Sequence, residues 1–196
     1  MYRYSGSHSD LHQESYVLTT LDSKENGYYV ELGSGDPSEG SNTFLLETKF
    51  NWKGLAIDND RSMVEKYNAE RSNECIEADA LTFNYEDYFI KHKFPKVIDY
   101  LQIDIDHHEE GHCLLALLAL PMLKYKFRVI TIEHDLIRNF KFESMRDAQR
   151  EVLHSLGYTL TGQFTSEDWW IHRDYVHTSD GNYPSYYMNP YFEGTR

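Results

Sequence analysis

The sequence contains few cysteines, few basic residues and no long apolar run. Cys75 and Cys113 are its only cysteines, and they lack metal-ligand spacing, which is typical of reduced thiols in the cytoplasm. Lys and Arg number 19 against 32 Asp and Glu, and no basic stripe is present, which argues against a nucleic-acid partner. The longest apolar run, residues 113–120, is too short to span a membrane, and residues 1–10 lack the apolar core of a signal peptide. We therefore expect a cytoplasmic protein that binds neither nucleic acid nor membranes.

A glycine-rich turn follows the first apolar segment of the chain. Residues 29–32 form that segment, and Gly33-Ser34-Gly35 follows directly; a second apolar segment, residues 54–57, ends at Asp58. Glycines let the backbone approach a ligand closely, and an acid after the second strand can accept hydrogen bonds from ribose hydroxyls. The pattern predicts a nucleotide-type cofactor site. A turn without a ligand would also explain the glycines, and Asp58 could instead cap the next helix, as could Asn59 or Asp60.

Strand and helix patterns alternate along the 196 residues, a length that fits one domain. This alternation predicts an α/β fold: a Rossmann-like, doubly wound, seven-stranded and mostly parallel sheet with helices on both faces, in three layers. We place the domain at residues 1–176, with a leading helix within 11–25, and a Tyr/Pro-rich tail at 177–196. The predicted strands are 27–32, 54–58, 75–78, 97–105, 128–133, 158–164 and 168–173. The predicted helices are 11–21, 42–50, 60–71, 85–91, 110–120 and 144–156, the last ending at Gly157.

Several short motifs, in order, resemble the FkbM-type family of class I S-adenosylmethionine-dependent methyltransferases over roughly residues 11–176. They are His12-Gln13-Glu14, the segment 27–33, Ser41-Asn42-Thr43 with Leu46-Glu47, the segment 52–58, Ile103-Asp104-Ile105-Asp106, Ile132-Glu133-His134-Asp135 and Glu167-Asp168-Trp169-Trp170. Two motifs depart from the family: Asp106-His107-His108-Glu109-Glu110-Gly111 replaces a carboxylate-x-Glu-Gly run, and Gly35-Asp36-Pro37 replaces Asn-Asp-Gly. The first departure touches the expected reaction centre, and the second touches only the shape of a loop.

The resemblance implies S-adenosylmethionine as the cofactor. It implies that Glu31 and Gly33 line its methionine and ribose end, that Asp58 takes the ribose hydroxyls, and that Asp79 takes the adenine amino group. It also suggests that Gln13 and Glu14 close over the cofactor, although an exposed first helix would explain them as well. The full set of predicted cofactor-binding residues is Glu31, Gly33, Ser34, Gly35, Asp58, Asn59, Asp79, Ala80 and Asp104.

A dense cluster of acids and histidines follows the fourth predicted strand, where ligands bind in open α/β sheets. In one interpretation a carboxylate or histidine removes a proton from the methyl acceptor, and the candidates are Asp104, His107 and His134. In a second, Asp104, Asp106 and Glu133 hold a divalent cation such as Mg²⁺ or Mn²⁺. A third, a phosphoesterase with an Asp-His-His triplet, is disfavoured because the Asp-x-Asp loop that it needs near the first strand is missing.

These observations predict an O-methyltransferase whose partner is a small-molecule or glycan hydroxyl, most plausibly on a sugar. Trp169 and Trp170 could hold a sugar ring by stacking, or could belong to the core. We also expect that the chain can form a homo-oligomer. Two alternatives stay open: an NAD-dependent oxidoreductase, although the third glycine of its usual motif is replaced by Ser38, and a cofactor-binding domain without catalysis.

Overall fold

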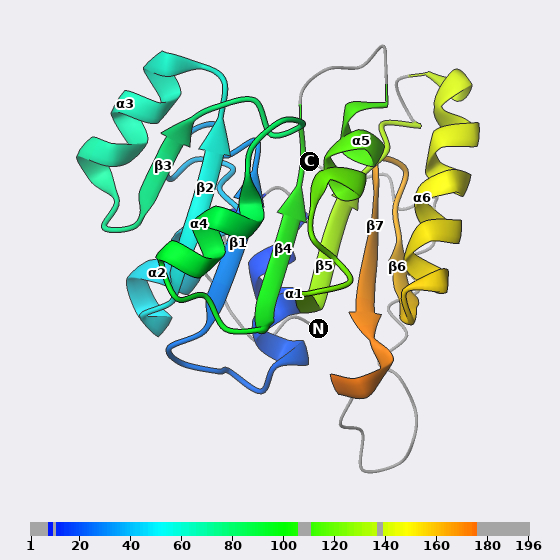
Figure 1. Ribbon diagram of the computed structural model, residues 1–196, viewed down its shortest axis with the longest axis horizontal. Coiled ribbons are helices and arrows are strands. Elements are labelled where there is room, and N and C mark those ends of the chain that lie inside the picture. The colour runs from blue at the N-terminus through cyan, green and yellow to red at the C-terminus, as the bar shows by residue number, and fades with distance from the viewer. Residues whose placement is uncertain (1–7, 10, 106–110, 137–138, 176–196) are drawn as a thin grey trace, which may run out of the picture.

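The computed structural model describes residues 8–9, 11–105, 111–136 and 139–175, and these form one seven-stranded sheet covered by helices (Figure 1). The strand order is β3-β2-β1-β4-β5-β7-β6. The strands are β1 (Tyr28–Leu32), β2 (Lys53–Asp58), β3 (Glu74–Glu77), β4 (Val97–Ile103), β5 (Lys126–Glu133), β6 (Tyr158–Gln163) and β7 (Glu167–His172). The helices are α1 (Gln13–Thr20), α2 (Phe44–Phe50), α3 (Arg61–Glu70), α4 (Tyr85–Lys91), α5 (His112–Ala119) and α6 (Glu143–Ser155), with short 3₁₀ turns η1 (Phe140–Phe142) and η2 (Arg173–Tyr175).

The sheet is mostly parallel, as the sequence predicts. Strands β1 to β5 pair in parallel, and β7 lies antiparallel between β5 and β6. The order reverses between β1 and β4, which are neighbours although two strands separate them in sequence. In doubly wound sheets this reversal is the place where ligands bind, beyond the carboxyl ends of the strands.

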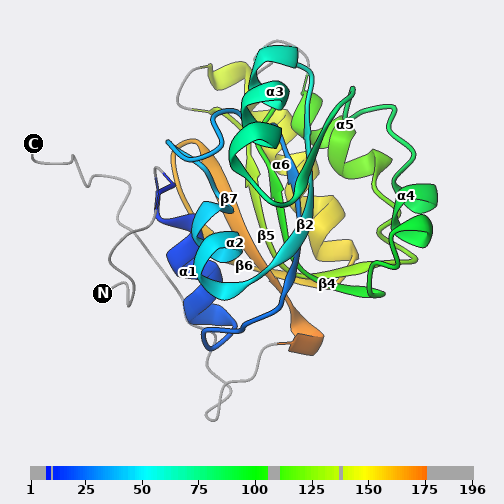
Figure 2. The ribbon, with the colours of Figure 1, turned by 90° about the vertical axis from the view of Figure 1, so that its left-hand side faces the viewer.

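Helices cover both faces of the sheet, so that the predicted three layers are present (Figure 2). Helices α1 and α2 pack against one face with Tyr29, Trp52 and Trp169. Helices α4, α5 and α6 lie on the other face, over the apolar residues of the central strands. Side chains alternate along a strand, so Val30 and Leu32 face the second layer, whereas Tyr29 faces the first. Both faces of the central strands are therefore buried, as expected of a parallel sheet.

Two helix ends follow directly from the sequence. Helix α3 is capped by Asp60, whose carboxylate accepts the backbone N–H groups of Ser62 and Met63. Helix α6 is followed by Gly157, which has a φ of 92° that suits glycine. Element bounds differ from the predicted ones by about two residues; β4, for instance, ends at Ile103 instead of 105. No helix of the described residues is long and apolar enough to cross a membrane. The predicted tail, 177–196, lies outside those residues.

Candidate active site

A cavity of about 780 Å³ lies at the carboxyl ends of the parallel strands. Its size falls in the range of sites that enclose a small organic ligand. Its walls come from the loops after β1, β2, β3 and β4, together with the start of α5 and the end of β5. The lining residues are Gly33, Ser34, Gly35, Asp36, Glu39, Gly40, Asn42, Ile57, Asp58, Asn59, Asp60, Met63, Ala78, Asp79, Ala80, Leu81, Asp104, Ile105, His112 and Glu133.

The glycine turn after β1 forms one wall of this cavity. Gly33 has a φ of 79° and donates its N–H to the Ile57 carbonyl at 2.9 Å, which joins the turn to β2. A Cβ atom at Gly33 would lie 1.7 Å from the Asp104 carbonyl oxygen, so only glycine lets β1 and β4 approach this closely. Gly35 has a φ of 54°, but a Cβ atom there would meet nothing within 4 Å. Gly33 is thus fixed by packing, whereas Gly35 borders open space.

Asp58 lies at the end of β2 and links the second strand to the glycine turn. Its Oδ2 accepts the N–H of Gly35 and its Oδ1 accepts the N–H of Asp60, each at 2.8 Å. Asp60 caps α3 in its place, so the helix-cap interpretation of Asp58 is wrong. Two backbone donors therefore fix the Asp58 carboxylate at the cavity wall, a position from which it can still accept hydrogen bonds from a ligand.

The loop after β3 forms the wall beside Asp58. Asp79 is exposed toward the cavity, and its Oδ1 accepts the N–H of Leu81 at 2.8 Å, which shapes the turn. Ala80 and Asn59 also line the cavity, as does Ser34, whose hydroxyl lies 3.3 Å from the Cys75 sulfur. Eight of the nine predicted cofactor residues line this single cavity; the exception is Glu31.

Glu31 is buried on the face of the sheet that α2 covers. Its Oε2 accepts the hydroxyl of Thr43 at 2.7 Å, and it does not line the cavity. Burial raises its pKa to about 7, although Arg71 and the Thr43 hydroxyl act in the opposite direction. Gln13 and Glu14 are also buried away from the lining: Gln13 donates to Glu167 at 3.1 Å, and Glu14 accepts the N–H of Leu45. These three residues hold secondary-structure elements together.

Seven of the lining residues carry carboxylates, and none is Lys or Arg; the acids are Asp36, Glu39, Asp58, Asp60, Asp79, Asp104 and Glu133. Such a lining repels phosphate groups and attracts positive charge. S-adenosylmethionine carries a sulfonium and an ammonium group. The acidic side chains that line the cavity therefore fit the positively charged groups of this cofactor.

Asn42 is a lining residue that motif reasoning did not assign to the site. Its side chain is 7% exposed, and its Oδ1 atom has no hydrogen-bond partner among the described residues. An unpaired buried amide oxygen costs free energy, and at the cavity wall this oxygen can accept a hydrogen bond from a ligand. Its place just before α2, in the motif Ser41-Asn42-Thr43, was the only signal in the sequence.

Three carboxyl groups meet where β4 and β5 end. Glu133 interacts with Asp104, which directly follows β4, and with Asp135, two residues further along the sequence. Burial and these two neighbouring acids raise the pKa of Glu133 well above its ordinary value. Asp135 is 6% exposed and has a φ of 52°, a backbone conformation that side chains other than glycine seldom adopt. Asp135 is a second residue that the motif analysis did not assign to the site.

His134, a predicted base, does not line this cavity. It is 5% exposed, its Nδ1 accepts the N–H of Leu136 at 3.3 Å, and its Nε2 lies 3.8 Å from Asp168. Asp168 in turn receives two hydrogen bonds from Arg150, at 2.7 and 2.9 Å. With Nδ1 as an acceptor, the ring proton sits on Nε2, so neither nitrogen offers a lone pair to a substrate. The other predicted base, His107, lies outside the described residues, as does Asp106.

The predicted cation has no assembled ligand set in the part of the chain that the structure describes. No group of three or more His, Cys, Asp or Glu side chains there is arranged to hold a metal ion. Asp104 and Glu133, two of the predicted ligands, do lie together at the cavity.

The interpretation of Trp169 and Trp170 as a sugar-binding pair is wrong. Both side chains are fully buried, and they pack in different hydrophobic clusters on opposite faces of the sheet. Consecutive residues of a strand point in opposite directions, so they cannot form one platform.

Three solved structures that superpose on this chain are described as methyltransferases or methylases. A suspected rRNA methylase from Clostridium thermocellum superposes with a TM-score of 0.58 at 11% identity, over 86% of this chain and 99% of that chain. A TehB-like S-adenosylmethionine-dependent methyltransferase from Corynebacterium glutamicum gives 0.53 at 13% identity, over 82% and 88%. The N-terminally truncated METTL16 methyltransferase domain gives 0.51 at 12%, over 82% and 79%. At these identities the likeness shows the fold alone, which is that of a Rossmann-like methyltransferase.

The sequence itself identifies the family. The model of the methyltransferase FkbM domain matches residues 13–160, which is most of the chain, whereas a comparison with curated proteins gave no match. The chain therefore belongs to the FkbM methyltransferase family and is an S-adenosylmethionine-dependent methyltransferase. This membership decides against the NAD-dependent oxidoreductase.

Proposed function

We propose that this methyltransferase methylates a hydroxyl group on a small, uncharged acceptor such as a sugar, and that Asp104 is the base. The observation that carries the proposal is the group of Asp104, Glu133 and Asp135 where β4 and β5 end, with Asp104 and Glu133 on the cavity wall. S-adenosylmethionine supplies the methyl group when bound. A hydroxyl is a weak nucleophile at neutral pH, so a protein group must take its proton during transfer.

The three acids divide this task. Because like charges in contact cannot all ionise, the group retains a proton near neutral pH. Burial and the two neighbouring acids raise the pKa of Glu133, so we place that proton on its carboxyl. Protonated Glu133 can then donate a hydrogen bond to the Asp104 carboxylate, which stays charged on the cavity wall and is free to accept a proton from the acceptor hydroxyl.

The charge of the lining supports an acceptor without phosphate. Seven acidic side chains and no Lys or Arg line the cavity, so a nucleic-acid backbone would meet repulsion there. Two of the structural neighbours, the suspected rRNA methylase and METTL16, share only the fold with this chain. We therefore keep nucleic acid outside the proposed acceptors and include RNA in the test.

The test measures transfer of a labelled methyl group from S-adenosylmethionine to a panel of sugars, glycans, amines and RNA. With the best acceptor, we expect Asp104→Asn to lower kcat by about a hundredfold or more. Glu133→Gln is the matched control, because an amide has the shape and the donor group of a protonated carboxyl. It should keep kcat within about tenfold, and both variants should bind S-adenosylhomocysteine like the wild type.

Other outcomes would overturn separate parts of the proposal. Transfer to RNA or amines alone would refute the hydroxyl acceptor. A hundredfold loss in His134→Gln with full activity in Asp104→Asn would move the base to His134. Cofactor binding without transfer to any acceptor would favour the domain without catalysis. Repeating the assay after exhaustive chelation tests the predicted divalent cation, since a metal-assisted reaction would stop.

A further inference from the structure

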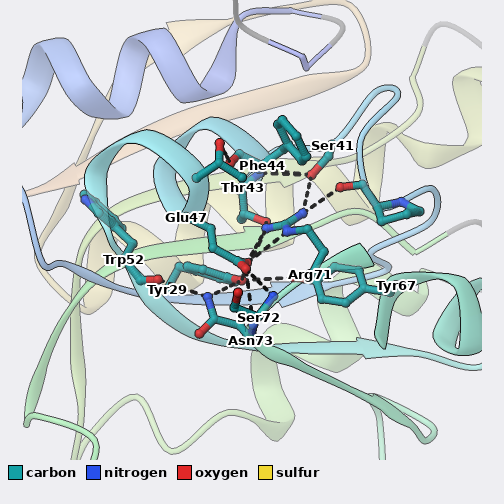
Figure 3. Close-up of polar contacts among 12 residues, drawn as sticks. Tyr29, Ser41, Thr43, Phe44, Glu47, Trp52, Tyr67, Arg71, Ser72 and Asn73 are labelled. Carbon is teal, nitrogen blue, oxygen red and sulfur yellow. Dashed lines mark hydrogen bonds and ion pairs between the residues drawn. The ribbon is translucent and has the colours of Figure 1, made fainter. Parts of the chain in front are cut away.

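A buried arginine holds the outer side of the loop that lines the cofactor cavity. Arg71 follows α3 directly, and its side chain is fully buried. Figure 3 shows its guanidinium group at the centre of a polar cluster between α2, α3 and β1. Arg71 does not line the cavity and no sequence motif marks it.

The partners of Arg71 alternate with the lining residues along the loop. Its Nη1 donates to the Pro37 carbonyl at 2.7 Å and to the Ser41 hydroxyl at 3.3 Å, and its Nη2 donates to the Thr43 hydroxyl at 3.1 Å. None of these three residues lines the cavity, whereas their neighbours Asp36, Gly40 and Asn42 do. The loop therefore has two sides: one faces the cavity and the other is bonded to one guanidinium group.

Glu47 of α2 fixes the orientation of Arg71. The Glu47 Oε2 atom accepts Arg71 Nε at 2.9 Å and lies 2.8 Å from Nη2, while Oε1 accepts the N–H groups of Ser72 and Asn73. Burial alone would raise the pKa of Glu47, but Arg71 and the N–H groups of Ser72 and Asn73 together outweigh burial and lower the pKa, so the pair is ionic. Tyr67 stacks on the guanidinium with its ring centre 4.7 Å away. Only a planar guanidinium group, with its five N–H donors, can bond to all of these acceptors at once.

We propose that Arg71 is a positioning residue that pre-organises residues 34–43 for the cofactor. This inference rests on the proposed cofactor cavity and adds a determinant of affinity that does not touch the cofactor. A lysine keeps the charge but cannot make the same set of directed bonds. If the loop then adopts its binding arrangement in roughly one molecule in ten, the apparent Kd for the cofactor rises about tenfold.

Arg128→Lys supplies a matched control. Arg128 is also paired with a buried carboxylate, Asp99, at 3.1 Å and stacked on a tyrosine, Tyr175, at 4.7 Å. The Arg128–Asp99 pair lies near the amino-terminal ends of β4 and β5, at the edge of the sheet opposite the cavity. The same substitution there perturbs an ion pair and a contact with an aromatic ring without touching the loop.

The experiment compares the wild type, Arg71→Lys and Arg128→Lys by calorimetric titration with S-adenosylhomocysteine, by thermal unfolding, and by hydrogen exchange of residues 34–43 without ligand. We expect Arg71→Lys to weaken binding at least about tenfold and to speed exchange of the loop. Arg128→Lys should change affinity by less than about twofold, even if it lowers Tm as much. Glu47→Gln should act in the same direction as Arg71→Lys, and it replaces that variant if the lysine variant does not fold.

Affinity within twofold of the wild type in Arg71→Lys, with loop exchange unchanged, would overturn the inference and leave Arg71 a stabilising residue only. An equal loss of affinity in Arg128→Lys would also overturn it, because binding would then follow global stability. A wild-type chain that binds no S-adenosylhomocysteine would overturn the cofactor assignment itself, and the wild-type titration therefore keeps the two proposals apart.

Discussion

Alanine at Gly33 should damage stability, whereas alanine at Gly35 should damage cofactor binding. Both glycines have positive φ values, 79° and 54°, so alanine at either position costs about 1–2 kcal/mol in backbone conformation. At Gly33 the new Cβ would also lie 1.7 Å from the Asp104 carbonyl oxygen, a backbone atom held between strands. Overpacking of this kind adds about 1–3 kcal/mol. We therefore expect a loss of about 2–5 kcal/mol for Gly33→Ala and about 1–2 kcal/mol for Gly35→Ala.

Urea unfolding followed by tryptophan fluorescence measures this difference, since Trp52, Trp169 and Trp170 are buried and report on the core. Calorimetric titration with S-adenosylhomocysteine supplies the second readout. The Gly35→Ala methyl group would stand in open space at the cavity wall, so we expect its Kd to rise about tenfold or more despite a nearly intact fold. Equal losses of stability in Gly33→Ala and Gly35→Ala would refute the argument that a Cβ atom at Gly33 overlaps the Asp104 carbonyl oxygen. Wild-type affinity in Gly35→Ala would show that the space beside Gly35 is not cofactor space.

Two further predictions concern Asn42 and Glu31. Asn42→Ala should weaken binding of S-adenosylhomocysteine by about 1–3 kcal/mol, the usual cost of a lost partner for a buried polar group, and unchanged affinity by calorimetry would remove Asn42 from the site. Because burial raises the pKa of Glu31 to about 7 from 4.5, the unfolded chain releases this proton first as pH rises, so the free energy of unfolding should fall between pH 4.5 and about pH 7. Glu31→Gln should remove on the order of 3 kcal/mol of that fall, as measured by urea unfolding at each pH; an unaltered pH dependence would contradict the assignment.

Much of the fold could be predicted because its signals are local. All seven strands were predicted near their observed positions, and the glycine turn with Asp58 marked the edge of the sheet where the cavity lies. Helix α3 begins at an aspartate cap and α6 ends at a glycine, as capping chemistry requires. Strand ends were less well predicted. For example, β5 begins at Lys126, two residues before the predicted start, because its pairing with β4 extends the strand beyond its apolar core.

The parts of the site that could not be predicted depend on contacts between distant segments. Asn42 reaches the cavity because of where the start of α2 lies. Arg71 donates hydrogen bonds to loop residues that lie 28 to 34 positions earlier in the sequence. Strand alternation alone would have placed Glu31 on the face of Tyr29, which α2 covers. It would also have corrected the Trp pair, because adjacent tryptophans in a strand must point to opposite faces. For the tryptophans the motif was given more weight than the geometry of the strand.

The acids of the cavity have two kinds of environment, and this difference assigns their roles. Asp58 and Asp79 each accept backbone N–H groups, and Asp60 caps a helix, so their charge is satisfied by fixed donors. Such carboxylates are suited to hold loops and to accept hydrogen bonds from a ligand. Glu133 has other carboxyl groups as its neighbours, and burial with them raises its pKa. Acids that differ in this way can serve binding and proton transfer in one cavity at one pH. We therefore expect acid–base chemistry on the side where β4 and β5 end, and cofactor binding on the side of β1, β2 and β3.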